Sequence, residues 1–335
     1  MAERITLAHG GGGVQMQELI RRELLPACDE TLGRALEDAA LLPGAERIVL
    51  TTDSYVVRPA VFPGGDLGRL AVCGTVNDLA MRGAQPAYLS LGLIVEEGTE
   101  IELLRTVMRS VQKTCVETGV KLVTGDFKVV EKHSGDGIFA NTTGVGFLRS
   151  RSAPSVSRAR PGDKVLLNGP LGQHGVAILA ARGELTLQAT VESDCAPLSD
   201  LVEALLEAGG DGVHTLHDPT RGGLAAALNE IAQTAGVAVE VSERNFPRDP
   251  GVEGACDLLG LDRLQVANEG KLVALVAPEV AEPVLEAMRG HASGRQAALI
   301  GEALEGPAGR VTLRTVLGTR RIVDSPSGEL LPRIC

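Results

Sequence analysis

The sequence has very few aromatic residues and no excess of basic ones. Its 335 residues include no Trp, 2 Tyr and 5 Phe, and 43 Asp and Glu outnumber 32 Lys and Arg, for a formal net charge of −11. Proteins that bind nucleic acid need a basic surface and often stack bases on aromatic rings. The composition therefore argues against a nucleic-acid binder and against binding to an anionic membrane surface.

The sequence also lacks long apolar runs and paired cysteines. No stretch approaches the roughly 18 apolar residues of a membrane span, and the opening MAERITLAHG has no apolar signal core. The six cysteines are scattered without a CxxC pair, which argues against a locally spaced metal site and a secreted disulfide framework. We therefore expect a cytoplasmic protein with no membrane or nucleic-acid partner, in which Cys73 and Cys115 are buried, inert thiols.

The last cysteine, Cys335, closes the sequence. It ends the segment DSPSGELLPRIC, whose Pro, Gly and Ser residues prevent a long helix. We expect residues 324–335 to form a flexible tail that can extend over roughly 35–40 Å and carry the thiol to a distant site.

Length and element order predict an α/β protein of two domains. Apolar residues recur at helical spacing in LGRLAVCGTVNDLAMRGA and EIELLRTVMRSVQKTCVETGV, and AYLSLGLIV and KLVTGD have the pattern of strands. In RIVLTTDSYVV we expect the polar TTDS to break the strand. The segment RSRSAPSVSRARPGD has little apolar periodicity, so we place the domains at 1–152 and 153–323, followed by the tail.

A glycine block follows the N-terminus. His9 and Gly10, Gly11, Gly12 and Gly13 precede a helix-like segment. Consecutive glycines let backbone N–H groups approach an anion, and a helix N-terminus adds a favourable field. The block fits neither the Walker A spacing nor GxGxxG, so a flexible turn is the alternative interpretation.

Three aspartates stand among small polar residues in the first half. Asp53 lies in TTDS, Asp78 in GTVNDLAMRGA and Asp126 in TGDFKVV, with Lys128 two residues further on. Carboxylates at element ends are what Mg²⁺ with substrate phosphates requires, and Lys128 could neutralise phosphate charge or act as a base. Each aspartate taken alone could instead cap a helix or turn.

The second half contains fewer candidates. LHDPTRGGL places Asp218, Thr220 and Arg221 before a Gly-Gly pair that opens a helix, a further anion-ready N-terminus. Glu269 in ANEGK precedes a strand, and from spacing we expect an exposed turn acid. No GxSxG occurs, so hydrolase chemistry of that type is not indicated.

Taken in order, these blocks resemble a known superfamily. HGGGG, TTDS, GTVNDLAMRGAQP, TGDFKVV, NTTGVG, HDPTRGGL and NEG are similar to the ATP-binding superfamily of aminoimidazole ribonucleotide synthetase (PurM) and selenophosphate synthetase. With the terminal PRIC, the chain resembles the HypE family of hydrogenase maturation factors over nearly its whole length. The resemblance implies a PurM-like fold of two αβ domains, each a mixed sheet with helices on one side. It also implies a homodimer in which two N-terminal sheets pair into a barrel.

The resemblance also implies a reaction and its partners. In this family the carbamoyltransferase HypF loads a carbamoyl group onto the terminal cysteine. ATP then drives dehydration of the S-carboxamide to a thiocyanate. The cyano group passes to iron on the HypC–HypD complex, for a [NiFe]-hydrogenase. Phosphorylation of the carboxamide oxygen would turn a poor leaving group into phosphate, with ATP and Mg²⁺ as cofactors.

The family's motifs carry over to particular residues. The match implies Cys335 as the carrier and Lys128 and Glu269 as groups that handle protons. Asp53, Asp78 and Asp126 are implied as Mg²⁺ ligands. The implied ATP contacts are His9, Gly10, Gly11, Gly12, Gly13, Asn77, Asp126, Asn141 and Arg221. In GPLGQHG the sequence departs from the family, because Gln173 stands where an Asp is expected, which puts a catalytic role for Gln173 or His174 in doubt.

Two alternatives stay open from the sequence. A related synthetase could activate another small substrate with ATP, although selenophosphate synthetase would require a reactive Cys near the glycine block, and the first cysteine is Cys28. A docking protein could use PRIC only as a recognition tag. Prenylation is excluded, because three residues would have to follow the cysteine.

Overall fold

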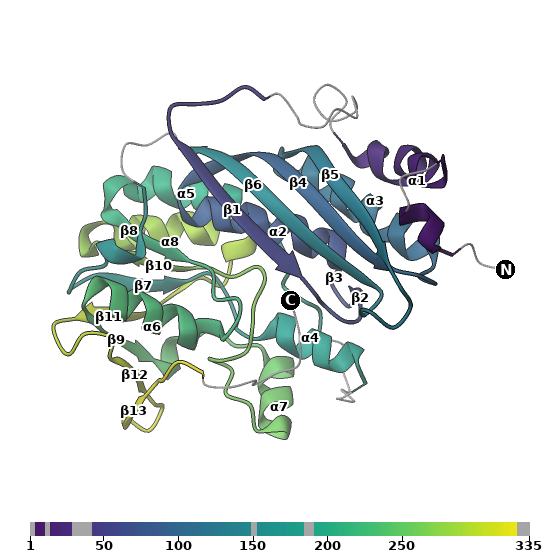
Figure 1. The fold of residues 1–335 in the computed structure, drawn as a ribbon. Coiled ribbons are helices and arrows are strands. Elements are labelled where there is room, and N and C mark those ends of the chain that lie inside the picture. Colours follow the sequence, from purple (N-terminus) through teal and green to yellow (C-terminus); the bar gives the residue numbers. More distant parts are fainter. Residues whose placement is uncertain (1–3, 11–13, 29–41, 149–152, 184–190, 327–335) are drawn as a thin grey trace.

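The chain folds into two α/β regions that pack against each other (Figure 1). The computed structural model describes residues 4–10, 14–28, 42–148, 153–183 and 191–326. The first region contains α1 Val14–Leu19, β1 Ile48–Tyr55, β2 Val61–Phe62, β3 Gly65–Asp66, α2 Leu67–Met81, β4 Ala84–Glu96, α3 Ile101–Thr118, β5 Lys121–Val130 and β6 Ile138–Leu148. Among the residues that the structure describes, no helix is both long enough and apolar enough to span a membrane.

The N-terminal region is built on a four-stranded sheet in the order β1-β6-β4-β5. β1, β6 and β4 pair antiparallel, whereas β5 joins β4 in parallel after the α3 crossover. Helices α2 and α3 lie on one face of this sheet (Figure 1). The other face carries exposed Ile48, Leu50 and Ile94. The expectation of helices on one side is confirmed for this region.

Helix α2 is apolar around most of its circumference because it is covered on two sides. Its Leu70 and Cys73 belong to the core beneath the four-stranded sheet, whereas Ala80 and Met81 pack with the second region. A helix that is apolar all round is one that is buried all round. The Asp66 carboxylate caps its N-terminus by accepting the N–H groups of Gly68 and Arg69. Arg69 and Asn77 of α2 reach the second region, where they donate to the carbonyl oxygens of Cys195 and Ala196.

The second region is built on a seven-stranded mixed sheet in the order β13-β12-β9-β11-β7-β10-β8. Its strands are β7 Lys164–Leu167, β8 Val213–His217, β9 Ala238–Ser242, β10 Val273–Val276, β11 Ala298–Leu304, β12 Val311–Arg314 and β13 Arg320–Ile322. Its helices are α4 Gln173–Ala181, α5 Ser199–Gly209, α6 Gly223–Ala235, α7 Pro250–Leu259 and α8 Ala281–Gly290.

Helices cover both faces of this larger sheet. Val165 of β7 packs in the core with Leu228 of α6, whereas its neighbour Leu166 packs with Leu205 of α5 and Leu285 of α8. Because successive side chains of a strand point to opposite faces, α6 and the α5–α8 pair lie on opposite sides. The expectation of helices on one side is wrong here.

The polar TTDS does not interrupt its strand. β1 runs unbroken through Ile48–Tyr55, and its even-numbered residues are exposed while Thr51, Asp53 and Tyr55 face α2. Two sequence-derived boundaries involve residues that the structure does not describe, the division at 152 and the tail that ends at Cys335.

Candidate functional site

Four carboxyl groups from four elements gather where the two regions meet. Asp53 lies near the end of β1, Asp78 on α2, Asp218 after β8 and Glu269 before β10. The charges of Asp218 and Asp53 act on the pKa of Asp78, and those same two charges act on the pKa of Glu269. We call these four residues the acidic cluster.

The sequence around β1 and α2 fixes the N-terminal half of the cluster. Thr51 Oγ1 donates to Asp78 Oδ2 at 2.8 Å. Tyr55 lies over Gly74, where a Cβ atom would collide with its hydroxyl, and its hydroxyl is 3.3 Å from Thr75 Oγ1. The close approach allowed by Gly74 holds β1 against α2, so that Asp53 and Asp78 face the same space.

Burial and mutual repulsion hold protons on this cluster. Burial, together with the charge of Asp218, raises the pKa of Asp78 to about 7, although the hydrogen bond from Thr51 opposes the shift. Burial also raises the pKa of Asp218, whose side chain is 14% exposed. Carboxylates in such surroundings gain stability from a bound cation.

Glu269 is the most enclosed member. Its relative exposure is 4%, so the expectation of an exposed turn acid is wrong. Burial, followed by the charges of Asp194 and Asp218, raises the pKa of Glu269 well above its usual range. Its carboxyl has no hydrogen-bonding partner among the described residues, so it is available to a substrate.

Asn77, next to Asp78 on α2, uses its amide within the protein. Its Nδ2 donates to the carbonyl oxygens of Ala196 (3.1 Å) and Glu269 (3.3 Å), and its Oδ1 accepts from Leu198 N–H (2.8 Å). Asn77 is 2% exposed. These contacts make it a clamp between the two regions, whereas the sequence predicted an ATP contact.

A second polar group lies on the exposed face of the four-stranded sheet. Asp126 Oδ1 is 2.7 Å from Lys128 Nζ, and both side chains are more than half exposed. Asn141 donates to Ser54 Oγ and to Asp53 O, each at 2.9 Å. Register aligns Asp126, Gly92, Asn141 and Ser54 in one row across the sheet. We call Asp126, Lys128 and Asn141 the open-face group.

This placement separates Asp126 from the other two aspartates that the resemblance implies as Mg²⁺ ligands. Three inter-strand spacings of about 4.8 Å separate Asp126 from β1, roughly 14 Å in all, and Asp53 points to the other face. Ligands of one Mg²⁺ ion lie only about 2.1 Å from it. Within one chain, Asp126 is therefore too far from Asp53 and Asp78 to share one ion with them, and a Mg²⁺ role for all three stays a prediction that would need a second ion or a second chain.

The glycine block begins beside the open-face group. The 3₁₀ turn Leu7–Gly10 packs against β5, the strand of Asp126 and Lys128. His9 Nδ1 accepts the Thr6 N–H at 3.0 Å, so its proton is on Nε2, which can donate. Gly11, Gly12, Gly13 and Cys335 lie outside the described residues.

The second-half candidates differ in accessibility. Arg221 is exposed at the start of α6, where it can reach a phosphate. Gln173 donates to Asp249 Oδ2 (2.9 Å), the N-cap of α7, and His174 is fully buried with Nδ1 2.8 Å from Ser193 Oγ. The departure at Gln173 therefore serves packing between α4 and α7.

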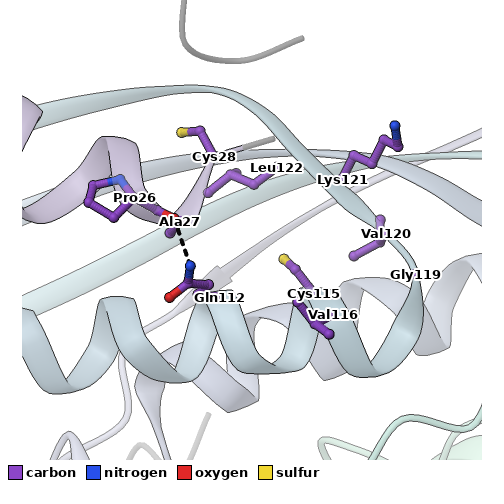
Figure 2. A pocket seen from close by; sticks show the side chains of 10 residues that line it. All are labelled: Pro26, Ala27, Cys28, Gln112, Cys115, Val116, Gly119, Val120, Lys121 and Leu122. Carbon is purple, nitrogen blue, oxygen red and sulfur yellow. Dashed lines mark hydrogen bonds between the residues drawn. The ribbon is translucent and has the colours of Figure 1, made fainter. Parts of the chain in front are cut away.

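A pocket of about 310 Å³ lies away from the acidic cluster, beside α3 (Figure 2). Cys28 and Cys115 line it, and Gln112 Nε2 donates to Pro26 O at 2.8 Å. Burial raises the pKa of Cys115 to about 12, which keeps it a protonated thiol. Cys73 is fully buried and Cys115 is nearly so, so the prediction of buried thiols at 73 and 115 is confirmed.

Sequence reasoning missed the contacts that organise the cluster. Asp218 was noted in its block without a metal or proton role, and Asp194 and Lys271 were not noted at all. Asp194 stands in VESDCAPL, far from any Gly-rich motif, and only a three-dimensional contact reveals it. A carboxylate among small polar residues was the single available signal.

Models of two known domains match the chain. The N-terminal domain of AIR synthase related proteins matches residues 36–148, and the C-terminal domain matches residues 160–314. The carbamoyl dehydratase HypE of Rhodobacter capsulatus is 49% identical over 99% of this chain and 98% of its own. A crystal structure of hydrogenase maturation protein HypE in complex with ATP superposes with a TM-score of 0.95 at 44% identity, covering 98% of this chain and 99% of the other. A HypE–HypF complex structure gives a TM-score of 0.81 at 46% identity, over 94% of this chain and 100% of the other.

Fold and site together define a two-domain protein of the AIR synthase related class. Within that class the similarity is specific and extends over the full length. The chain belongs to the HypE family of carbamoyl dehydratases, which act in hydrogenase maturation.

Proposed function

We propose that this chain uses ATP to dehydrate a carbamoyl group on Cys335 to a thiocyanate, which supplies the cyanide ligand of [NiFe]-hydrogenase iron. The observation that carries the proposal is a buried, unpartnered carboxyl, Glu269, within a cluster of four carboxyl groups. Pro326, the last described residue, lies against Gly222 at the start of α6. The nine residues from Pro326 to Cys335 can span roughly 30 Å, enough to reach the cluster.

The chemistry needs a phosphoryl transfer and the loss of two protons. The carboxamide oxygen attacks the γ-phosphorus of ATP, ADP leaves, and the nitrogen loses its first proton. The bond between carbon and the phosphorylated oxygen then breaks, phosphate leaves, and loss of the second N–H proton completes the carbon–nitrogen triple bond. We assign proton acceptance to Glu269, because its carboxyl is enclosed and unpartnered.

The protonation state of Glu269 sets the direction of the pH dependence. Because burial raises its pKa, Glu269 keeps its proton to a higher pH than an ordinary glutamate does, and only its deprotonated form can accept a proton from the carboxamide. Dehydration should therefore accelerate as pH rises through this raised pKa.

The residues present fit a magnesium ion. The raised pKa values of Asp78 and Asp218 show carboxyl groups crowded without a cation, and no three His, Cys, Asp or Glu side chains within the described part of the chain are grouped to hold a metal unaided. This suits Mg²⁺, which binds through one or two carboxylates together with phosphate oxygens and water. We propose Asp53 and Asp78 as its protein ligands. When bound, the ion neutralises charge on the transferring phosphate.

Because the two sites lie on opposite faces of one sheet, we propose that the open-face group of one copy contacts the nucleotide held at the acidic cluster of the other copy in a homodimer. Ile48, Leu50 and Ile94 are 56%, 68% and 45% exposed on that face, which a second copy could cover. Lys128 and Arg221 can neutralise phosphate charge, and His9 Nε2–H and the backbone of Gly10 can donate to phosphate oxygens. Asn77 is proposed to act through its clamp on Glu269.

The proposed partners follow from the relatives. We propose HypF as the carbamoyl donor, because a chain in the structure of a HypE–HypF complex resembles this chain in fold and is 46% identical to it. The HypC–HypD complex is proposed to accept the cyano group, and we propose that the reaction takes place in the cytoplasm.

Intact-mass analysis tests the reaction. The protein is carbamoylated on Cys335 with HypF, carbamoyl phosphate and ATP, then repurified and mixed with MgATP. We expect the loss of the mass of one water with ATP and no loss with a non-hydrolysable analogue. Persistence of the carbamoyl mass with MgATP would reject the dehydratase assignment.

A further inference from the structure

Asp194 holds the backbone on which Glu269 stands. Its Oδ1 accepts the Glu269 N–H at 3.2 Å, and its Oδ2 accepts the Gly270 N–H at 3.1 Å. Lys271 Nζ donates to Oδ2 at 2.9 Å. The Asp194 and Lys271 side chains are 3% and 8% exposed, so this is a buried ion pair whose carboxylate accepts three hydrogen bonds.

A buried ion pair of this kind contributes little net stability, but it holds the backbone groups that it binds in fixed positions. The cost of removing two charges from water offsets much of their attraction. Burial alone would raise the pKa of Asp194, but the charge and hydrogen bond of Lys271 lower it below its usual range, so the carboxylate stays ionised. An ionised acceptor makes stronger hydrogen bonds to the two backbone N–H groups than a neutral one.

Residue 270 shows how closely the two segments fit. A Cβ atom at Gly270 would collide with the backbone oxygen of Asp194. The turn therefore needs glycine at this point, and Asp194 can approach both N–H groups only because of it.

The segment that carries Asp194 is also tied to the N-terminal region. Ser193 N–H donates to Pro63 O at 2.8 Å. The Asn77 amide donates to Ala196 O and accepts the Leu198 N–H. Asn77 also donates to the Glu269 carbonyl oxygen. Residues 193–198 thus connect α2, which carries Asp78, to the turn that carries Glu269.

We infer that Asp194, with Lys271 as its counter-ion, is a positioning residue that fixes the place of the Glu269 carboxyl for the dehydration step. This inference rests on the role proposed above for Glu269. It predicts that the pair acts on the rate of the chemical step and leaves nucleotide binding unchanged.

The test is single-turnover water loss from carbamoylated protein, followed by intact mass at varied MgATP. In Asp194→Asn the rate constant at saturating ATP should fall about 100-fold, as expected for a misplaced catalytic group, while half-saturation by ATP stays at the parent value. Asp194→Asn leaves Lys271 unpaired and can lower stability. The double variant Asp194→Asn with Lys271→Met removes both charges, and it should melt near the parent and still be slow.

A matched control exists in the same region. Asp163 is equally buried, accepts the Arg160 N–H at 2.8 Å and pairs with His214 at 2.9 Å. It adjoins Lys164, which pairs with Val276, at the end of β10 that is remote from Glu269. Asp163→Asn should lower the melting temperature and leave the dehydration rate at the parent value.

A double-mutant comparison separates positioning from general damage. In the slow Glu269→Gln background, adding Asp194→Asn should change the residual rate little, because the group being positioned is already gone. An additive loss there, or a parent rate in the folded Asp194/Lys271 double variant, would overturn the inference. If Glu269→Gln itself dehydrates at the parent rate, the role of Glu269 fails and the inference fails with it. If Glu269→Gln is slow but Asp194→Asn dehydrates at the parent rate, the inference about Asp194 fails while the proposed role of Glu269 stands.

Discussion

The acidic cluster and the open-face group lie on opposite faces of one four-stranded sheet, and they differ in the charge they carry. Burial raises the pKa of Asp78 to about 7 in the cluster. On the open face, the hydrogen bond from Lys128 lowers the pKa of Asp126. Two aspartates in similar sequence settings thus have opposite shifts.

The difference shows that surroundings, more than spacing, decide what a carboxyl group can do. A buried, partly protonated cluster can bind a cation and exchange protons. An exposed aspartate paired with lysine stays ionised, and its pair contributes little to stability. We therefore assign proton transfer to the cluster and nucleotide placement to the open face, and the predictions below test that division.

The largest effect is expected for Glu269→Gln. Loss of a general base typically costs 10²–10⁴-fold, so water loss from the carbamoylated protein should slow by about 1000-fold. Glutamine keeps the size of the side chain, so HypF should still load Cys335. Intact mass over several hours measures both steps, and a parent rate of water loss would remove Glu269 from the chemistry.

The pH dependence sharpens the same assignment. Because Glu269 must lose its proton to act as a base, the parent rate should rise over the pH range in which Glu269 loses its proton, which burial moves above that of an ordinary glutamate. The Glu269→Gln variant should lose that rise. A parent rate that falls over this range would show that the protonated form is the active one.

A smaller effect is expected for Asp78→Asn, about 100-fold on the rate with a higher Mg²⁺ requirement, because one proposed ligand loses its charge. Asp126→Asn is the matched exposed variant, and we expect no change in its Mg²⁺ requirement. A magnesium titration of the dehydration rate compares them. Equal shifts in the two variants would contradict the separation of cluster and open face.

Lys128→Met should act on nucleotide binding, with about a tenfold rise in the ATP concentration for half-saturation and a nearly normal maximal rate. The reason is that an exposed lysine contributes charge to phosphate binding. Its place on the open face separates it from Glu269 within one chain. A collapse of the maximal rate with unchanged ATP binding would instead make Lys128 a base.

The last of these effects is on stability without metal and not on the reaction rate. The pKa of Asp78 is raised on folding, so the folded protein binds a proton more tightly than the unfolded chain between about pH 4 and pH 7. Its contribution to the unfolding free energy is therefore present at low pH and is lost as pH rises through about 7. Since the shift from 3.8 to about 7 corresponds to about 4 kcal/mol, the unfolding free energy of Asp78→Asn should rise by about 4 kcal/mol relative to that of the parent as pH increases from 4 to 8. Urea unfolding at several pH values in EDTA measures this, and a difference independent of pH would refute it.

Local patterns predicted the helices better than the site. The apolar periodicity of α2 and α3 was sufficient to place both, and α3 ends at Gly119, which has a φ of 70°. TTDS was misjudged as a break because polar residues are common in turns. In this strand Thr51 hydrogen-bonds to Asp78 and Thr52 to the neighbouring strand. Strand interior and turn are distinguished here by contacts that are distant in sequence.

The site was predicted by motif but not by arrangement. Asp53, Asp78 and Glu269 were each selected, but strand order decides that Asp126 lies on another face. The backbone N–H of Glu269 donates to Asp194, which lies 75 residues earlier in the chain. No periodicity in either segment encodes that contact, so only the folded structure reveals it.

Oxygen transfer tests the proposed use of ATP most directly. Cys335 is carbamoylated with a carbamoyl group that carries oxygen-18 in its carbonyl, and MgATP is added in ordinary water. Phosphorylation of the carboxamide oxygen predicts that the released phosphate contains oxygen-18 in proportion to the thiocyanate formed. Unlabelled phosphate, with thiocyanate formed at the normal rate, would contradict it.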